Sequence, residues 1–510
     1  MTENTVLVNG DRLTIEDICH LANQTKALQL SDAVNFRDRI DKGALFVNKL
    51  LREEGVVYGI TTGYGDSCTV PIPLEYVADL PRNLYTFHGC GLGTHFDRVQ
   101  TRAIMAVRIN SLAQGFSGVR YQLLLQISQL LKHDILPLIP QEGSVGASGD
   151  LTPLSYLAAV VAGEREVWYQ GQIQSAETVF NALTIAPLKL NPKEGLAIMN
   201  GTAVMTALAC LAYQRAAYLS QLSTRITSLV SVALLGNAGH FDESLFSVKP
   251  HEGQIKVARR IREDLSVVGQ ASRNDARLQD RYSLRCAPHV IGVLEDALPW
   301  FRQFIENELN SANDNPIIDA EHERVLHGGH FYGGHIAFAM DSLKTVVANL
   351  ADLIDRQMAQ LVDPKFNHGL PANLSGAKGE QAMLNHGFKA VQIAVSAWTA
   401  EALKLTMPAS VFSRSTECHN QDKVSMGTIA ARDCIRVLEL TEQVAAAVLI
   451  AAVQAVELRS EGQPLSANLN MTLSQVREHV PFLEADRALE QALRLCLQLI
   501  RDQHWSLYGP

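Results

Sequence analysis

The sequence of 510 residues has few aromatic residues, no closely spaced cysteine pair and no long apolar run. Aromatic residues make up only 6% of the chain, and with abundant alanine and leucine this composition favours helices. The eight cysteines never form a Cys-x-x-Cys pair, so the sequence indicates neither a zinc site nor a redox dithiol, and we expect no metal. The longest apolar run, residues 444–453, is far shorter than the roughly 20 residues that span a membrane.

The chain also lacks an excess of basic residues. Lysine and arginine number 44 against 53 acidic residues, which gives a net charge of −9 and argues against a nucleic-acid or anionic-membrane partner. Residues 1–14 are polar and contain no apolar region typical of a signal peptide, so we expect a cytoplasmic protein with reduced thiols. With 47% hydrophobic residues, the chain can bury a large core, and its length allows roughly two to four domains.

Short elements and glycine-rich turns are predicted for the first part of the chain, residues 1–202. Residues 7–14 indicate a small hairpin at Asn9-Gly10, followed by a short helix from Ile15. A second hairpin is predicted over residues 167–174, with its turn at Gly171. We therefore expect a mixed N-terminal domain over residues 1–202.

Long helices are predicted for the rest of the chain. Residues 207–236, 334–362 and 426–459 contain no proline and carry apolar residues at helical spacing. Helices that are apolar around much of their surface must be buried in a bundle or between subunits. The sequence therefore predicts a mainly α protein, in which the mixed domain stands on a large helical bundle domain of residues 203–510.

The segment GSVGASGDLTPLSYL, residues 143–157, carries the most chemical information. One interpretation is a tight turn before a helix, with Asp150 or Thr152 as N-cap, or a nest of amides that binds an anion. A sharper one begins from three small residues, Ala147-Ser148-Gly149. In a strained turn the Gly149 nitrogen can attack the Ala147 carbonyl carbon, because glycine has no Cβ to block the approach. Loss of water from the ring and from Ser148 then gives a methylidene-imidazolone, an electrophile that no ordinary side chain supplies.

These residues resemble the histidine/phenylalanine/tyrosine ammonia-lyase family, whose signature G-S-x-G-A-S-G-D-L-x-P-L matches residues 143–154. The resemblance implies removal of ammonia from a small aromatic L-amino acid in a mainly helical homotetramer. It also implies a 4-methylidene-imidazol-5-one electrophile made from Ala147-Ser148-Gly149, with no external cofactor. Five further segments match family motifs in the family's order: YGITTGYG (58–65), KEGLAIMNGT (193–202), QDRYSLRC (279–286), NSANDNP (310–316) and HNQDKVSM (419–426).

Residue roles follow from the same resemblance. Tyr58 matches the family's base, and a tyrosine with a pKa near 10 can act so only where its phenolate is favoured. Arg285 matches the arginine that clamps the substrate carboxylate, for which a guanidinium fork is suited. Asp150 is expected to hold the strained loop. The other matched positions are an asparagine that bonds the electrophile and three residues of the pocket: Asn200, Gln279, Tyr282 and Phe331.

The substrate is less clearly indicated. In similar enzymes the ring end of the pocket is formed by two adjacent residues, here Phe87 and His88, which match none of the usual pairs. Phe87 offers an apolar wall, and His88 offers a hydrogen-bond partner for a phenol or an imidazole. Gln421 stands where histidine-specific relatives have glutamate, so we expect tyrosine or phenylalanine in preference to histidine. His289 and His330 depart from most relatives and can alter ring selection.

Three alternatives to a tyrosine or phenylalanine ammonia-lyase stay open. A histidine ammonia-lyase would form urocanate, and an aminomutase would use the same electrophile but return the ammonia to the β-carbon. A non-catalytic helical relative would need neither Tyr58, the Ala147-Ser148-Gly149 loop, Asn200 nor Arg285, so the presence of all of these argues against it.

Overall fold

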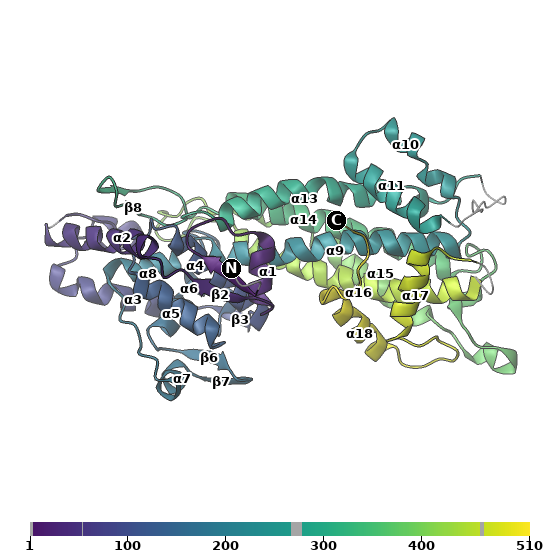
Figure 1. Ribbon diagram of the computed structural model, residues 1–510, viewed down its shortest axis with the longest axis horizontal. Coiled ribbons are helices and arrows are strands. Elements are labelled where there is room, and N and C mark those ends of the chain that lie inside the picture. The colour runs from purple at the N-terminus through teal and green to yellow at the C-terminus, as the bar shows by residue number, and fades with distance from the viewer. Residues whose placement is uncertain (1–3, 54, 267–277, 460–463, 510) are drawn as a thin grey trace. The chain divides into compact units, whose positions relative to one another are not determined.

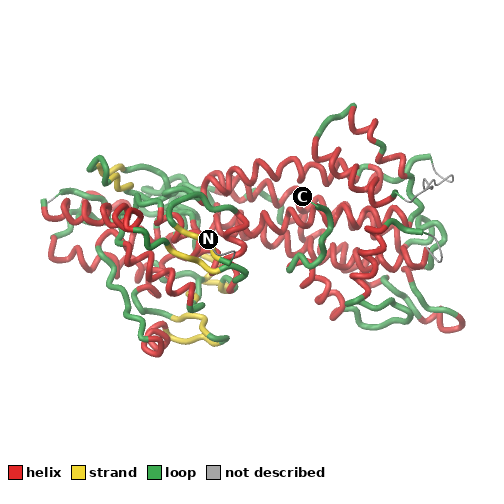
Figure 2. The backbone as a smooth tube through the Cα atoms, viewed as in Figure 1, coloured by secondary structure: helices red, strands yellow, loops and turns green. Residues whose placement is uncertain are grey.

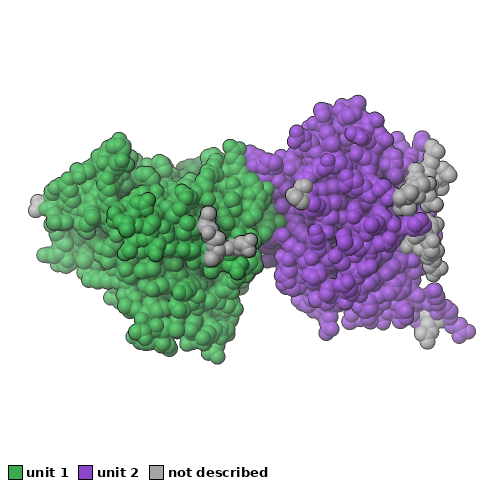
Figure 3. Space-filling model, viewed as in Figure 1, with its two compact units in different colours: residues 1–214, 302–341, 408–432 green, residues 215–301, 342–407, 433–510 purple. Residues whose placement is uncertain are grey.

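The computed structural model describes residues 4–53, 55–266, 278–459 and 464–509 (Figure 1). Helices dominate these residues, and the strands are short (Figure 2), so the prediction of a mainly α protein is confirmed. The chain forms two compact units, coloured separately in Figure 3. Unit 1 comprises residues 1–214, 302–341 and 408–432, and unit 2 comprises residues 215–301, 342–407 and 433–510. The division into domains at residues 202 and 203 stays a prediction.

Unit 1 contains the short elements expected in the first part of the chain. Its strands form small sheets of two or three strands, in the pairings β1-β2, β3-β5, β4-β6-β7 and β8-β9. The elements that lie wholly in unit 1 are β1 (Thr5–Val8), α1 (Ile15–Ala22), β2 (Ala27–Leu30), α2 (Val34–Arg52), η1 (Gly65–Thr69), η2 (Leu74–Asp79), α3 (Leu80–Phe87), β3 (Leu92–His95), α4 (Arg98–Ala113), α5 (Tyr121–Lys132), β4 (Leu136–Pro137), β5 (Pro140–Glu142), α6 (Leu151–Val161), β6 (Glu166–Tyr169), β7 (Gln172–Ser175), α7 (Ala176–Leu183), α8 (Pro192–Met199), β8 (Ile317–Asp319), β9 (Arg324–Leu326) and η6 (Ala409–Phe412).

One of the two predicted hairpins is present. Strands β6 and β7 pair antiparallel around Gly171, as expected. The prediction of a hairpin at Asn9-Gly10 is wrong. Strand β1 pairs in parallel with β2, with Thr5 opposite Ala27 and Val8 opposite Leu30. The Asn9-Gly10 turn instead leads into α1, which begins at Ile15 as predicted and is capped by a reciprocal pair, Thr14 and Asp17.

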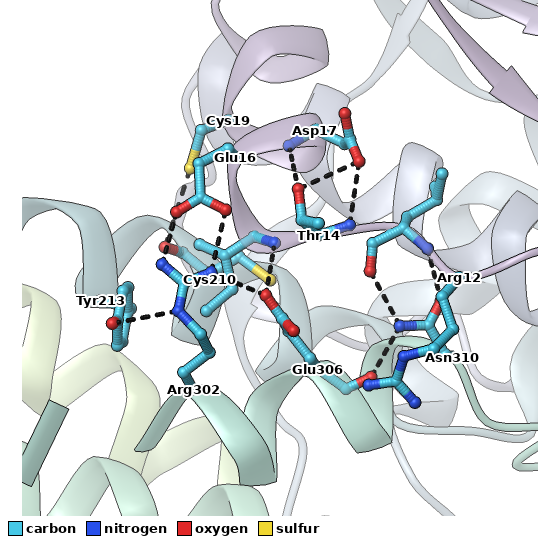
Figure 4. Close-up of polar contacts among 12 residues, drawn as sticks. Arg12, Thr14, Glu16, Asp17, Cys19, Cys210, Tyr213, Arg302, Glu306 and Asn310 are labelled. Carbon is cyan, nitrogen blue, oxygen red and sulfur yellow. Dashed lines mark hydrogen bonds and ion pairs between the residues drawn. The ribbon is translucent and has the colours of Figure 1, made fainter. Parts of the chain in front are cut away.

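An ion-pair cluster joins α1 to the last turns of α13 (Ala287–Leu309) (Figure 4). The Arg302 guanidinium donates to both Glu16 carboxylate oxygens, at 2.5 and 2.9 Å, and to Glu306 Oε1 at 2.8 Å. Its Nε also donates to the Tyr213 hydroxyl at 3.3 Å. All four residues belong to unit 1, so this cluster joins its early and late segments.

Four long helices have one part in each unit: α9 (Ala203–Ala233), α13 (Ala287–Leu309), α14 (Gly334–Val362) and α16 (Gly427–Arg459). Three of them confirm the helices predicted from proline-free, apolar stretches. The elements that lie wholly in unit 2 are η3 (Ala238–Phe241), α10 (Glu243–Ser247), α11 (Glu252–Leu265), α12 (Tyr282–Arg285), η4 (Ala372–Leu374), η5 (Gly379–Leu384), α15 (Lys389–Lys404), α17 (Ala467–Arg477) and α18 (Glu490–Arg501).

Helix α9 is buried although its second half contains many serines and threonines. The hydroxyls of Thr224, Thr227, Ser228 and Ser231 each donate to the carbonyl oxygen four residues earlier, at 2.8 to 3.2 Å. These bonds give the four hydroxyl hydrogens an acceptor inside the helix itself, so these side chains can be buried without an acceptor from a neighbouring element.

Candidate active site

A pocket of about 470 Å³ in unit 1 brings together six of the residues predicted from the sequence. These are Tyr58, Phe87, His88, Ser148, Asn200 and Gln421, which come from segments far apart in the chain. The remaining residues of the pocket wall are Gly63, Tyr64, Gly65, Ser67, Val70, Ile72, Leu84, Leu151, Leu196 and Glu417.

Tyr58 lies in a turn that its neighbours anchor. Val57 and Ile60 are buried in a cluster with Phe46, Val77 and other apolar residues, which fixes the backbone on either side of Tyr58. The Gly65 amide donates to the Tyr58 phenol oxygen at 2.7 Å. Burial raises the pKa of the Tyr58 phenol, the Gly65 hydrogen bond lowers it, and the Glu417 carboxylate raises it again. Within unit 1, therefore, the amide of Gly65 is the group that favours the phenolate.

The loop between β5 and α6, residues 143–150, is held by Asp150. Asp150, one of the two residues predicted for the N-cap, occupies that position of α6, but its side chain does not cap the helix. Its Oδ2 accepts the amides of Val204 and Met205, both at 3.0 Å, at the start of α9, where the helix dipole favours an anion. Its Oδ1 accepts the hydroxyls of Ser144 and Thr428. The carboxylate thus joins the loop to two long helices.

Burial raises the pKa of the Asp150 carboxyl to about 6, against the hydrogen bonds from Thr428, Met205, Ser144 and Val204, which lower it. The side chain is fully buried, so its charge depends on these donors rather than on water.

The predicted electrophile segment fits the geometry of the loop. Gly149 has a φ of +73°, in the left-handed region, and a Cβ there would overlap the Gly201 carbonyl. Only glycine fits this position without a shift of the backbone. The adjoining Asn200 ends α8, and its Oδ1 is buried with no hydrogen-bond partner among the described residues. A buried acceptor left unpaired in a pocket wall is suited to a ligand or prosthetic group.

Gln421 contacts Ser148 rather than standing free in the pocket. Its Nε2 donates to Ser148 Oγ at 3.3 Å, and its Oε1 accepts the Thr416 hydroxyl at 2.9 Å. The residue therefore lies beside the loop of Ala147-Ser148-Gly149, and both ends of its amide are engaged.

His88 follows the last turn of α3 in a defined protonation state. Its Nδ1 lies 2.9 Å from the Leu84 carbonyl oxygen, which can only accept, so Nδ1 carries the proton. Burial lowers the pKa of the His88 imidazole, which favours the neutral ring at pH 7. Nε2 is then a hydrogen-bond acceptor. The Phe87 ring packs on the His88 ring at 4.3 Å between centroids.

Sequence reasoning missed one acidic residue of the pocket, Glu417. Its Oε1 accepts the Asp66 amide at 2.8 Å, and its Oε2 accepts the Asn420 side-chain amide at 2.9 Å. Glu417 stands four residues before Gln421 beside the same family motif, and that proximity was the available signal. Among the described residues that line the pocket, none is lysine or arginine.

Other predicted residues lie elsewhere in the structure. Gln279, Tyr282 and Arg285 belong to unit 2, where the Arg285 Nε donates to the Asp280 carbonyl at 2.9 Å and the guanidinium stacks on the Tyr282 ring. Phe331 is partly buried in the turn before α14 and does not line the pocket. Two histidines complete this set: His330, exposed in the same turn, and His289, whose ring lies 5.3 Å from that of Phe246.

The described part of the chain contains neither a candidate metal site nor a candidate membrane-spanning helix. No group of three or more metal-ligating side chains occurs there, and none of its helices is long and apolar enough to cross a membrane.

Comparison with known proteins identifies the class. The sequence model described as aromatic amino acid lyase matches residues 13–478. A histidine ammonia-lyase of Alkaliphilus oremlandii is 36% identical over 496 residues, which cover 97% of this chain and 96% of that protein. A histidine ammonia-lyase of Bacillus subtilis is 39% identical over 483 residues, or 94% of each chain. The crystal structure of tyrosine aminomutase from Streptomyces globisporus superposes with a TM-score of 0.91 at 32% identity, covering 98% of this chain and 97% of that one.

The fold and these similarities define an enzyme, a carbon–nitrogen lyase. The chain belongs to the aromatic amino acid lyase family, as its motifs indicated.

Proposed function

We propose that this enzyme is an ammonia-lyase that prefers L-tyrosine, and accepts L-phenylalanine less well, releasing coumarate or cinnamate. The observation that carries the proposal is the state of His88. With Nδ1–H held by Leu84, the remaining ring nitrogen accepts a hydrogen bond, and a phenol hydroxyl donates one. Phe87 adds an apolar, aromatic wall beside it. Phenylalanine would leave the His88 acceptor without a partner, which a buried site penalises.

The self-made methylidene-imidazolone is part of the proposal, and the residues present fit it. Ala147, Ser148 and Gly149 would form the group, with Asn200 and Gln421 beside it. When present, it supplies an electrophile that makes the amino group a better leaving group. Tyr58 is proposed to take the proton from the substrate β-carbon, with the Gly65 amide stabilising the oxygen as it gains charge.

Arg285 is proposed to bind the substrate carboxylate, since the pocket wall of unit 1 contains no lysine or arginine among its described residues. Gln279, Tyr282 and Phe331 are proposed as further substrate-binding residues, on the family resemblance alone. We also propose a cytoplasmic homotetramer. Large apolar side chains such as Ile393 and Met407 are 63% and 62% exposed in the single chain, and exposed apolar surface favours association.

Histidine is the second candidate substrate, and one specific observation favours it. The Glu417 carboxylate lines the pocket and could pair with an imidazolium, so the neutral Gln421 does not leave the site without negative charge. The two relatives described above are also named histidine ammonia-lyase. The similarity to a tyrosine aminomutase makes an aminomutase the alternative reaction, whose product would be a β-amino acid.

The test measures kcat/KM for tyrosine, phenylalanine and histidine in the parent and in His88→Leu. We expect tyrosine to lead in the parent by about tenfold or more over phenylalanine, the size of one hydrogen bond in a buried site. His88→Leu should reverse that order. Free ammonia and the arylacrylate chromophore should appear together, and product analysis should find no β-amino acid. Ser148→Ala provides the background rate. A parent that prefers histidine by tenfold would refute the proposal in favour of the second candidate.

A further inference from the structure

Two glycines meet where the loop of Ala147-Ser148-Gly149 contacts the end of α8. Gly149 and Gly201 form an isolated parallel bridge. The Asp150 amide donates to the Gly201 carbonyl at 2.8 Å, and the Gly201 amide donates to the Ser148 carbonyl at 3.3 Å. Because a Cβ on Gly149 would overlap Gly201, the two backbones are in direct contact. The position of Gly149 therefore depends on the position of Gly201.

Gly201 is in turn held from behind by a buried pair, Arg108 of α4 and Asn313. Gly201 has a φ of +146°, and a Cβ there would overlap both the Arg108 guanidinium and the Asn313 side-chain oxygen. Arg108 donates to Asn313 Oδ1 at 3.2 Å and to the Ala197 carbonyl at 2.7 Å. The result is a stack of three layers, in which the Arg108–Asn313 pair supports Gly201 and Gly201 supports Gly149.

The Asn313 amide is fixed on both sides. Its Oδ1 accepts the Ser111 hydroxyl at 3.1 Å as well as Arg108, and its Nδ2 donates to the Thr202 hydroxyl at 2.9 Å. Thr202 donates onward to Glu308 at 2.5 Å. Asn313 comes from the segment NSANDNP, which matches a family motif but takes no part in the chemistry proposed above.

Burying the Arg108 guanidinium costs desolvation free energy, so filling space does not by itself explain an arginine at this position. Its side chain is wholly buried, and its two hydrogen-bonded partners are an amide and a carbonyl oxygen rather than carboxylates. Burial lowers the pKa of the guanidinium to about 10. Replacing a whole buried charged cluster by well-packed apolar residues is often neutral or stabilising, so a buried charge is weak evidence of a stabilising role. What the guanidinium offers instead is a flat, rigid group with donors in fixed directions.

We propose that Arg108 and Asn313 are positioning residues for the closure of the ring from Ala147-Ser148-Gly149. By fixing Gly201 they keep the Gly149 nitrogen in place for attack on the Ala147 carbonyl carbon. In that step the N–C bond forms, and the carbonyl oxygen leaves as water with the hydrogens of the Gly149 and Ser148 amide nitrogens, so that a C=N bond to the Ser148 nitrogen replaces the C=O bond. The Ser148 hydroxyl then leaves with the Cα hydrogen as a second water, so no oxidant or reductant is needed. The inference rests on the proposed self-made electrophile and concerns its formation, not substrate turnover.

The experiment weighs intact chains of the full-length protein. The parent should weigh two waters less than the encoded chain. In Arg108→Gln and Asn313→Ala, a large fraction of folded, soluble chains should retain the encoded mass. A displacement of about 1 Å in a reacting group can slow a reaction about 10²-fold, so ring closure followed by mass over time should be slower by up to that factor. Turnover per dehydrated chain should stay within a few-fold of the parent.

Lys193→Met is the matched control. The Lys193–Asp314 pair is as deeply buried as Arg108, at 2.6 Å, and joins α8 to the residue next to Asn313, but it supplies none of the atoms nearest to a Cβ on Gly149 or Gly201. Even if Lys193→Met loses as much thermal stability as Arg108→Gln, its ring should close at the rate of the parent. Ser111→Ala removes one hydrogen bond to Asn313, together with the contact of the Ser111 hydroxyl with the Ser311 carbonyl. It covers the case in which Arg108→Gln fails to fold, and should slow ring closure more mildly.

The outcomes separate the two proposals. Equal ring closure in the parent, Arg108→Gln and Ser111→Ala would overturn the positioning role and leave the electrophile standing. Slowing in Lys193→Met to the same degree as in Arg108→Gln would also overturn it, as a general effect of destabilisation. A parent at the encoded mass would instead refute the electrophile itself.

Discussion

Both units bury charged side chains, and two of these clusters, one in each unit, are bonded in different ways. In unit 1, Asp150 and Arg108 bond mainly to amides, hydroxyls and carbonyls of a loop and of helix ends. In unit 2, Arg225 pairs with Asp264 at 3.1 Å, and the hydroxyl of Tyr508 donates to the same carboxylate at 2.6 Å. The first arrangement fixes backbone around a pocket, whereas the second holds the C-terminal segment against its own unit.

The two clusters should therefore respond differently when a charged side chain is removed. The cation and anion of unit 2 compensate each other, so their loss should appear as a loss of stability. Asp150 and Arg108 of unit 1 are instead bonded to dipoles whose places define the loop, so their loss should appear in chemistry or in pH dependence. Four substitutions test this contrast, in order of expected size.

Tyr58→Phe should have the largest effect and should act on activity alone. It removes the phenol oxygen that accepts the Gly65 amide but keeps the ring that packs in the turn. Loss of a general base costs about 10²- to 10⁴-fold in rate. Burial raises the pKa of Tyr58, so kcat/KM of the parent should also climb with pH between about 7 and 10. Turnover within a few-fold of the parent would assign the base elsewhere.

Asp150→Asn should change the pH dependence of stability. The folded pKa of about 6 lies above the ordinary value of 3.8, so the folded state holds this proton more tightly. The contribution of this proton to the free energy of unfolding is therefore complete below about pH 4 and is lost as the pH rises to about 6. The loss is on the order of 3 kcal/mol. Thermal unfolding of parent and variant at pH 4 to 7 should show this loss only in the parent. Parallel curves would place the Asp150 pKa near its ordinary value.

Arg285→Lys tests whether unit 2 serves only as a scaffold. Lysine keeps the charge but loses the planar fork, so KM should increase and kcat should fall, together by about tenfold or more. Steady-state kinetics with tyrosine measures both. Unchanged kinetics, with unchanged thermal stability, would limit the described functional residues to unit 1.

Tyr508→Phe should have the smallest effect and should act on stability alone. It leaves a buried carboxylate, Asp264, without one of its donors, at a cost of about 1–3 kcal/mol. Differential scanning calorimetry should detect the change, with kcat unaltered. Tyr169→Phe is the control, because the Tyr169 hydroxyl accepts only an exposed bond from Gln170. Equal shifts in both variants would mean that the Arg225–Asp264 cluster adds nothing specific.

Structure is predicted best where a periodic apolar pattern extends over many residues, and site residues are predicted best where they stand in a matching family motif. The helices at residues 334–362 and 426–459 agree with the prediction to within one residue, because an apolar pattern at helical spacing over that length is too long for a strand. The pocket residues Tyr58, Asn200 and Gln421 could be selected because each stands in a matching motif.

Partner choice across the chain was not predictable in the same way. Strand β1 was assigned to a hairpin because Asn9-Gly10 is a strong local turn signal, yet its partner is β2, beyond a helix. The Asp150 carboxylate was expected to support its own loop, but nothing local indicates that it binds the amides of Val204 and Met205. Glu417 was overlooked for a similar reason, since its place in the pocket depends on how residues 413–421 fold back on Asp66.

The contact between Asp150 and Thr428 also has a consequence for protein synthesis. The two residues are 278 positions apart, and the ribosome makes about 5–20 residues per second. Roughly 15 to 55 seconds therefore pass between the synthesis of the loop and that of its last hydrogen-bond donor. During that time the nascent chain carries the Ala147-Ser148-Gly149 segment with only Ser144, Val204 and Met205 available as donors to Asp150. A chain that ends before residue 428 lacks the fourth donor, so we expect the proposed ring to close less readily in it than in the full-length chain.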